Sequence, residues 1–479
     1  MTLVIASILL LCYVVIATEY LTRINKAAVA IFAGTLCWVL YICYGSNFVM
    51  HEHQTDFIDF LGGAVPTSVA VKEYIATNVF LKYVGQAAEI VLFLLATMTI
   101  VEILDNNGCF DFIGQLLRTR RSKKMLWTLA IVTFLLSANL DNLTTTVMML
   151  VMMRRVITSR RQRMLYGAVI VVSATCGGLL TVIGDPIGLV LWNMGAVTAT
   201  NYSMSLLVPC LLAWSLTVWL IGRSLPERAD CEWMGMPYRG DDTRLRPWQR
   251  LLMLFVGIGG LWFIPSFHNI TKLSPFLGAL CVLSVLWVVD EIVNRKLMNA
   301  DQMSRRRMPQ MLKYGVIQMI LYVMGIMLTI GAFRETGALG VVSAWWDSHV
   351  MAWCMEHQWN DVWLSGSLAA LMSAFVDSFA TAMSFISIEQ VETTQLAQLS
   401  ADDVLGWTHR MQFVENGLYW KAIAFCSALG GNLLGIGSIC ALALIRMERI
   451  HIMWYVRNVG WKVLLGLVAG VAALYVFDF

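Results

Sequence analysis

Charged residues are scarce in this sequence. They make up 14% of its 479 residues, whereas hydrophobic residues make up 58%. About a quarter of the residues in an ordinary soluble domain are charged, so this chain has too few polar side chains to cover a soluble body. It also lacks a polar segment long enough for a separate soluble domain, and apolar stretches long enough to cross a bilayer recur from end to end. The composition predicts one integral membrane domain, residues 1–479, surrounded by lipid.

Motifs of enzymes and metal centres are also missing. The eleven cysteines form no C-x-x-C pair and no clustered even set, which argues against a disulfide framework and against a zinc site. The sequence contains no nucleophile elbow, phosphate loop or metal-ligand spacing, so we expect neither an enzyme nor a bound cofactor. His51-Glu-His53 is interpreted as a chance pair. The net charge of +3 does not indicate nucleic-acid binding.

Basic residues gather in a few loops and so indicate the topology. Under the positive-inside rule the cytoplasmic loops are 118–124, 154–163, 223–250, 295–313 and 446–462. Ten spanning helices are predicted, at about 2–18, 27–45, 86–104, 165–194, 203–222, 249–266, 274–293, 312–333, 419–444 and 459–478. The first is expected to be a span and not a signal peptide, because it lacks a basic leader and a cleavage site. Both termini are then predicted to lie outside.

Two further apolar stretches, about 125–153 and 361–388, do not fit a simple crossing. The first has basic residues at both ends, and the second has mostly acidic residues at both ends. A re-entrant hairpin that enters and leaves on one side satisfies both sets of flanks. The alternative of two ordinary spanning helices stays open. The predicted plan is 1–85 as N-terminal helices, 86–222 as a first repeat, 223–248 as a cytoplasmic connector and 249–479 as a second repeat, with one hairpin in each repeat.

The two hairpins share a sequence motif. Ser137-Ala-Asn-Leu-Asp141-Asn-Leu-Thr-Thr145 aligns with Ser373-Ala-Phe-Val-Asp377-Ser-Phe-Ala-Thr381. Downstream, Gly177-Gly-Leu-Leu-Thr-Val-Ile-Gly184 aligns with Gly430-Gly-Asn-Leu-Leu-Gly-Ile-Gly437. Two matched motifs in the same order, with opposite predicted orientation, are typical of inverted-repeat transporters. The predicted fold is therefore an all-α polytopic membrane protein with about ten spanning helices and two re-entrant hairpins.

Three aspartates, Asp141, Asp185 and Asp377, lie within the apolar stretches. An unpaired carboxylate there is costly and usually marks an ion or proton path. The glycines of the 177–184 and 430–437 motifs allow a helix to unwind. A continuous helical arm would put Ser137 and Asp141 on one face, and Ser373 and Asp377 likewise in the second copy. A carboxylate that holds either a proton or a sodium ion couples the two flows in opposite directions. The alternative is that these aspartates cap half-helices, above all Asp185, which precedes a proline.

The motifs at 137–145 and 177–185 resemble those of NhaD-type sodium/proton antiporters of the ion transporter superfamily, as do Ile24-Asn-Lys-Ala-Ala28 and Ala96-Thr-Met-Thr-Ile-Val-Glu102. The resemblance implies exchange of cytoplasmic Na⁺ or Li⁺ for external protons in a bacterial inner membrane. It also implies a homodimer in which a transport unit moves against a scaffold, with Na⁺ sites at Asp141 and Asp377. The residues expected to bind ions or protons are Ser137, Asp141, Asn142, Thr144, Thr145, Gly184 and Asp185 in the first copy, and Ser373, Asp377, Ser378, Thr381, Asn432 and Gly437 in the second.

The second copy departs from the family pattern. Ser378 stands where Asn is usual and Ala380 where Pro is usual, while Leu179 replaces an Asn in the first copy. A serine hydroxyl reaches less far than an amide, so the second site is expected to be weaker or altered in selectivity. Two other functions stay open. One is a sodium-coupled carboxylate symporter of the same superfamily, and the other is a membrane subunit or sensor that does not transport.

Overall fold

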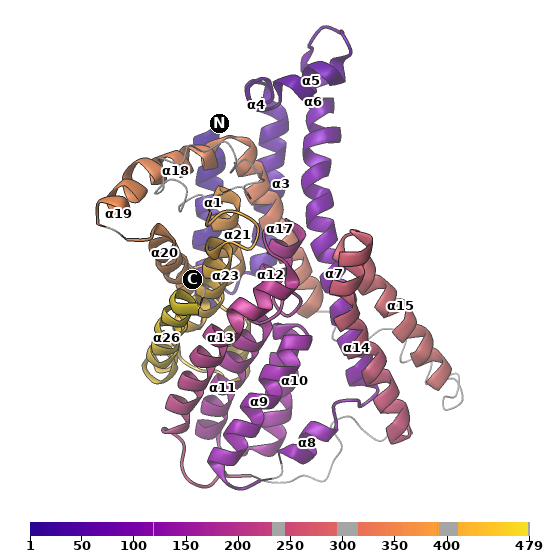
Figure 1. The fold of residues 1–479 in the computed structure, drawn as a ribbon, viewed down its shortest axis with the longest axis vertical. Helices are drawn as coiled ribbons and strands as arrows, with labels where there is room; N and C mark the ends of the chain where they lie inside the picture. Colours follow the sequence, from indigo (N-terminus) through magenta and orange to yellow (C-terminus); the bar gives the residue numbers. More distant parts are fainter. Residues whose placement is uncertain are drawn as a thin grey trace.

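The computed structural model describes residues 1–117, 119–231, 245–294, 315–357, 359–389, 391 and 411–477. Within these ranges the regular structure is helical, apart from isolated bridges such as those of Arg121 with Arg228 and of Ile157 with Cys231. The predicted all-α class is confirmed (Figure 1). The predicted loop 295–313 and residues 232–244 of the connector lie outside the described residues.

Eight helical runs within the described residues are long and apolar enough to cross a membrane. They are α3 (Lys26–Tyr44); α6 (Ser68–Tyr74), η1 (Ile75–Phe80) and α7 (Leu81–Asn106) as one run; α13 (Ala199–Gly222); α14 (Pro247–Thr271); α15 (Pro275–Asn294); α17 (Gly315–Glu335); α23 (Leu418–Leu434) with α24 (Ile439–Glu448); and α25 (Ile452–Tyr455), η5 (Val456–Gly460) and α26 (Trp461–Phe477) as one run.

The other two predicted spans are shorter or interrupted. α1 (Thr2–Ala17) has 16 residues. α11 (Arg160–Leu179) is separated by a break from α12 (Pro186–Asn193). With these two included, the prediction of a multi-pass fold with about ten spans is confirmed.

The third span is longer than the sequence indicated. A span was predicted at 86–104, but the helical run extends over 39 residues from Ser68 to Asn106. Lys72, Glu73 and Lys82 interrupt the hydropathy pattern without interrupting the helix, because charged residues are good helix formers where they meet water. In Figure 1 the α6 end of this run, with α4 (Ser46–Glu52) and α5 (Gln54–Leu61), stands above the ends of the other helices. Shorter helices connect the remaining spans: α2 (Glu19–Thr22), α8 (Phe112–Leu116), α18 (Ala338–Trp346), η3 (Asp347–Met351) and α19 (Ala352–Glu356).

Both predicted hairpins are present. α9 (Ser122–Asn139) and α10 (Asn142–Val156) form the first, and α20 (Asp361–Phe375) and α21 (Ser378–Ile388) form the second. In each hairpin the two helices contact each other, and both contact a neighbouring broken helix, α11 for the first and α23 for the second. α10 has 15 residues and α21 has 11, whereas a crossing takes about 20. Neither hairpin is therefore long enough to cross the hydrocarbon twice.

The packing between the halves follows the inverted repeat. α3 lies along α17, α15 lies along α7, and α13 lies along α26. α10 and α11 both contact α24, and α21 and α23 both contact α12. The contact of α1 with α3 is matched by that of α14 with α15, so the relation also reaches helices within residues 1–85. These contacts of one half therefore have counterparts in the other.

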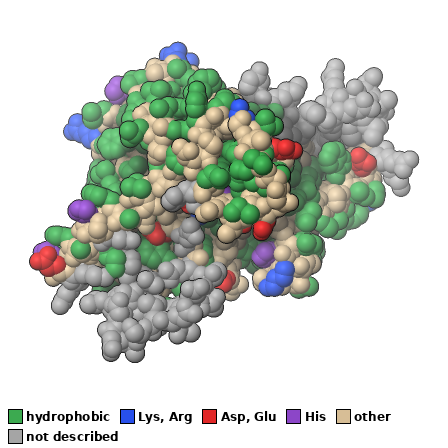
Figure 2. Space-filling view, turned by 90° about the horizontal axis from the view of Figure 1, so that it is seen from above, with side chains coloured by type: hydrophobic (Ala, Val, Ile, Leu, Met, Phe, Trp, Pro, Cys, Tyr) green, Lys and Arg blue, Asp and Glu red, His purple; other side chains and the backbone are tan. Residues whose placement is uncertain are grey.

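The two broken helices form the centre of the protein. α11 is buried without interruption over residues 165–179, and α23 is buried over residues 419–432. Where they meet, the Asn432 Nδ2 group donates a hydrogen bond to Thr175 Oγ1 at 2.9 Å. By contrast, only 22% of the residues in the membrane-spanning stretch of α14, and likewise of α15, are buried, which leaves their outer faces to lipid. Seen from the end where α4–α6 stand, hydrophobic side chains cover much of the described surface (Figure 2).

Candidate ion-binding site

At the first hairpin tip, only one of the two carboxylate oxygens of Asp141 accepts hydrogen bonds from the described residues. Asp141 caps α10, because its Oδ2 atom accepts hydrogen bonds from Thr144 N at 2.7 Å and from Thr144 Oγ1 at 2.8 Å. Its side chain is buried, and among the described residues its Oδ1 atom has no hydrogen-bond partner. The hydroxyl of Thr145, one turn into α10, is also buried without such a partner. Two oxygen atoms at this tip are thus available to a cation or a proton.

A second carboxylate reaches the same place from the break in the α11–α12 helix. Asp185 caps α12 by accepting a hydrogen bond from Ile187 N on Oδ1 at 2.9 Å. Its Oδ2 atom accepts one from Asn142 Nδ2 at 2.7 Å, and Asn142 N donates to Gly184 O at 3.1 Å. Asn142 therefore ties the hairpin tip to the break. α12, which Asp185 caps, contacts α21 of the second hairpin, so the tips and the break meet in one buried region.

The glycine motifs permit this close approach. A Cβ atom on Gly178 would lie 2.7 Å from Gly184 O and 3.2 Å from Ser137 Oγ. In the second half a Cβ atom on Gly431 would lie 2.9 Å from Gly437 O. The paired glycines therefore let the broken helix fold back against its hairpin. This packing role adds to the ease of unwinding that the sequence suggested.

The prediction that Ser137 and Asp141 share one helix face is wrong. α9 ends at Asn139 and Leu140 is extended, so the serine belongs to one helix and the aspartate begins the next. Ser137 Oγ donates to Ala174 O at 2.6 Å, and its counterpart Ser373 Oγ donates to Ser427 O at 2.5 Å. Both serines fasten their hairpin arm to a broken helix.

The alternative prediction, helix capping, is confirmed for all three aspartates. Capping occupies only one of the two carboxylate oxygens of Asp141. For that residue the capping role and a role in binding an ion are therefore compatible.

The second hairpin tip has the same backbone contacts but a different charge. Ser378 N donates to Gly437 O at 2.8 Å, as Asn142 N does to Gly184 O. Asp377 caps α21 by accepting from Phe379 N at 2.9 Å and from Ala380 N at 3.3 Å, both on Oδ1. Its Oδ2 atom forms an ion pair with Lys26 Nζ at 2.5 Å. The structure thus places an ammonium group where Na⁺ was predicted.

The structure places the two remaining predicted residues of the second half, Thr381 and Asn432, in different surroundings. Thr381 Oγ1, the counterpart of Thr145 Oγ1, is buried with no hydrogen-bond partner among the described residues. Asn432 faces Thr175 across the contact of the two broken helices and does not lie on a hairpin. The position that matches Asp185 is Ser438, which caps α24 through Ala441 N at 3.4 Å. The second half therefore lacks the second carboxylate.

Sequence reasoning did not include Lys26 among the site residues. It is the first residue of α3, and its side chain is 13% exposed. Its Nζ atom also lies 4.3 Å from the centroid of the Tyr322 ring, a cation–π contact. The sequence did contain a signal for Lys26. It stands at the start of an apolar span, in the stretch Ile24–Ala28 that resembles the NhaD-type antiporters. Nothing in the sequence connected it to a residue in the second hairpin.

Inverted repeats, broken helices and re-entrant tips that meet in a buried polar region define a secondary transporter. The chain matches the CitMHS family model, described as "Citrate transporter", over residues 13–407. It belongs to that family.

Named relatives confirm the predicted resemblance to NhaD-type antiporters. Sodium/proton antiporter 1 of Arabidopsis thaliana is 30% identical over 81% of this chain, which spans 62% of that relative's length. The Na(+)/H(+) antiporter NhaD of Vibrio parahaemolyticus is 23% identical over 93% of this chain and 100% of its own length. Among solved structures, the Alcanivorax borkumensis YdaH transporter, reported to have an unusual topology, aligns with a TM-score of 0.54 and 14% identity, covering 85% of this chain and 88% of that one. This last likeness concerns the fold.

Proposed function

We propose that the chain is a secondary sodium/proton antiporter whose cation and proton site is formed by Asp141 and Asp185. The observation that carries the proposal is the meeting of two buried carboxylates from two separate helix breaks, joined through Asn142. The names of the relatives support the same exchange. We further propose transport of Na⁺ or Li⁺ by a homodimer in a bacterial inner membrane, with both termini outside.

The chemistry of the site suits this exchange. Carboxylate, hydroxyl and backbone carbonyl oxygens are hard ligands, which bind small hard cations such as Na⁺. At the first tip, Asp141 Oδ1 and Thr145 Oγ1 are buried and have no hydrogen-bond partner among the described residues, and Asp185 adds a second negative charge. A proton on either carboxylate removes a charge that the cation needs. Proton and cation therefore exclude each other, which is the condition for antiport.

A sodium-coupled carboxylate symporter is the second candidate, because the matching family model is described as a citrate transporter. An anionic substrate next to Asp141 and Asp185 would be repelled by two carboxylates. The first tip offers no arginine or lysine to offset them, as far as its described contacts show. The charge of the first tip thus favours the antiporter.

Proton movement in proteoliposomes tests the proposal. An Na⁺ gradient is expected to drive proton flux through the wild type, and Asp141→Asn and Asp185→Asn are each expected to lower it by at least about 100-fold, since each removes a charge from a buried site. Asp59→Asn, on the exposed α5 helix, is the matched control and is expected to keep the wild-type rate. Full exchange by Asp141→Asn would refute the site. Labelled citrate uptake that depends on Na⁺, without Na⁺-driven proton flux, would establish the symporter.

The pH dependence gives a second test of the same site. Because a proton and Na⁺ compete for the carboxylates, the KM for Na⁺ is expected to rise as the pH falls, by up to about tenfold per pH unit for one competing proton. A KM that does not change between acid and neutral pH would mean that the proton and the cation bind at different groups.

A further inference from the structure

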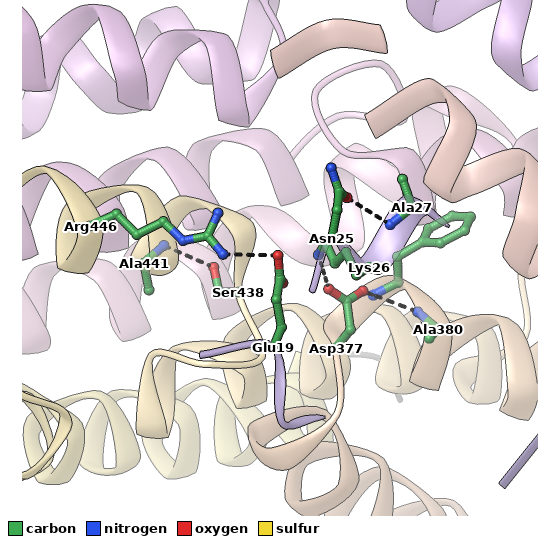
Figure 3. A network of polar contacts seen from close by, with 10 residues as sticks. Glu19, Asn25, Lys26, Ala27, Asp377, Ala380, Ser438, Ala441 and Arg446 are labelled. Carbon is green, nitrogen blue, oxygen red and sulfur yellow. Dashed lines mark hydrogen bonds and ion pairs between the residues drawn. The ribbon is translucent and has the colours of Figure 1, made fainter. Parts of the chain in front are cut away.

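Lys26 and Asp377 form a largely buried ion pair between the N-terminal helices and the second hairpin. Lys26 begins α3 and Asp377 begins α21, and their side chains are 13% and 2% exposed. Figure 3 shows the lysine pointing at the carboxylate, beside the Glu19 to Arg446 pair that joins α2 to α24. The lysine comes from the N-terminal helices and the aspartate from the second hairpin.

The ion pair leaves Asp377 fully engaged. Its Oδ1 atom accepts two backbone N–H groups and its Oδ2 atom contacts the ammonium group at 2.5 Å. Asp141, at the equivalent position of the first tip, has no cationic partner among the described residues and keeps one oxygen without a hydrogen bond. A lysine ammonium group is a compact monovalent cation. At Asp377 it therefore supplies the single positive charge that an alkali cation would supply.

We propose that Lys26 is a tethered counter-ion that occupies the cation position of the second hairpin tip, so that each chain binds one transported cation, at the first tip. The inference rests on the proposed antiport and specifies its stoichiometry of cation binding. The second tip keeps the backbone contacts of an ion site, but it is neutral without a bound ion. The first tip, with Asp141 and Asp185, is negative until Na⁺ or protons bind.

A purely structural ion pair makes a different prediction. If Lys26 only fastened α21 to α3, neutralising it would weaken the fold without creating a new cation site. If it occupies a cation position, neutralising it exposes a buried carboxylate that a free Na⁺ can pair with. The number of Na⁺ ions bound at equilibrium separates the two roles, because a structural role would not raise it.

Equilibrium binding of radioactive Na⁺ to the purified full-length protein is the experiment. The wild type, Lys26→Arg and Asp377→Asn are each expected to bind one Na⁺ per chain. Lys26→Gln is expected to bind a second, weaker ion, which the double variant Lys26→Gln with Asp377→Asn loses again. Lys462→Gln is the matched control, because Lys462 is also buried but pairs with the Ser224 hydroxyl at 2.7 Å; it is expected to bind one ion. Thermal unfolding of each variant confirms that the protein measured is folded.

The outcomes also distinguish this inference from the proposed function. A wild type that binds two Na⁺ ions, one of which Asp377→Asn removes, would overturn the role of Lys26 and leave antiport intact. A folded Lys26→Gln variant that still binds one ion would overturn it as well. A wild type that binds no Na⁺ would contradict the antiporter itself. Recovery of exchange in the double variant, relative to Lys26→Gln, would add support, because removing both charges leaves no unpaired carboxylate.

Discussion

Replacing Gly178 by alanine is expected to weaken cation binding at the first tip. A Cβ atom at this position would lie 2.7 Å from Gly184 O and 3.0 Å from Asn142 Cβ. The Gly184 carbonyl group would have to retreat by about 0.7 Å to reach the 3.4 Å at which ordinary contact begins. That carbonyl accepts the Asn142 N–H group at 3.1 Å, so the movement pulls the hairpin tip away from the break. Overpacking of this kind costs about 1–3 kcal/mol.

If the strain is concentrated at the cation site, this free-energy cost appears as a lower affinity for Na⁺. At 1.4 kcal/mol per tenfold change, Gly178→Ala raises the KM for Na⁺ by about fivefold to about 100-fold. The assay is proton flux in proteoliposomes over a range of Na⁺ concentrations, with thermal unfolding measured on the same protein. A wild-type KM in Gly178→Ala would refute the claim that the contact of Gly178 with Gly184 shapes the cation site.

Two control variants separate strain at the site from strain elsewhere. Gly431→Ala introduces the equivalent strain in the second half, where the new Cβ atom would lie 2.9 Å from Gly437 O. It is expected to lower stability as Gly178→Ala does but to leave the KM for Na⁺ close to the wild-type value, because Lys26 already serves that tip. Gly85→Ala adds a Cβ atom with nothing within 4 Å and is expected to change neither quantity.

Two other substitutions test the ion pairs at the ends of the helices. Glu448 is buried and pairs with Arg154 at 3.0 Å and Arg163 at 3.1 Å, so Glu448→Gln is expected to lower the free energy of unfolding by about 1–3 kcal/mol, and an unchanged unfolding curve would contradict this. Glu19 pairs with Arg446 at 2.9 Å beside a cavity of about 660 Å³. The arginine is 55% exposed, and exposed ion pairs contribute at most about 1 kcal/mol. Glu19→Gln is therefore expected to raise the KM for Na⁺ by no more than about fivefold. Loss of exchange in this variant would contradict that limit and give the Glu19–Arg446 pair a larger role.

The hairpins and helix breaks were predictable because close packing between them requires glycine at particular positions, and this leaves a motif in the sequence. Gly177 and Gly430 each face a backbone carbonyl of the adjacent hairpin arm, Phe134 O and Ala370 O. Such contacts exclude any side chain, so the same glycine motif follows the aspartate in both halves, although the number of residues between them differs. The charges of the flanking loops then gave the two hairpins opposite orientations. These features are local or periodic in the sequence, and hydropathy, charge and repeat could therefore reveal them.

Contacts between distant segments were not predictable in the same way. Lys26 and Asp377 are 351 residues apart, and their meeting depends on how α3 packs along α17 and how α17 packs against α21. The error at Ser137 and Asp141 has another cause. Spacing of four residues implies one face only if the helix continues, and the extended conformation of Leu140 ends it between them. Sequence periodicity does not indicate at which residue a re-entrant helix turns.

The two halves show that backbone symmetry and charge symmetry are independent. The hydrogen bonds that close each tip are preserved, from Asn142 N to Gly184 O and from Ser378 N to Gly437 O. Their loss would leave buried peptide groups without partners, so the fold constrains them. The charges carry no such constraint, because Ser438 caps a helix as Asp185 does and a lysine from outside the hairpin can balance the remaining aspartate. One half of an inverted repeat can therefore lose its cation site while it still supports the architecture that the other half needs for exchange.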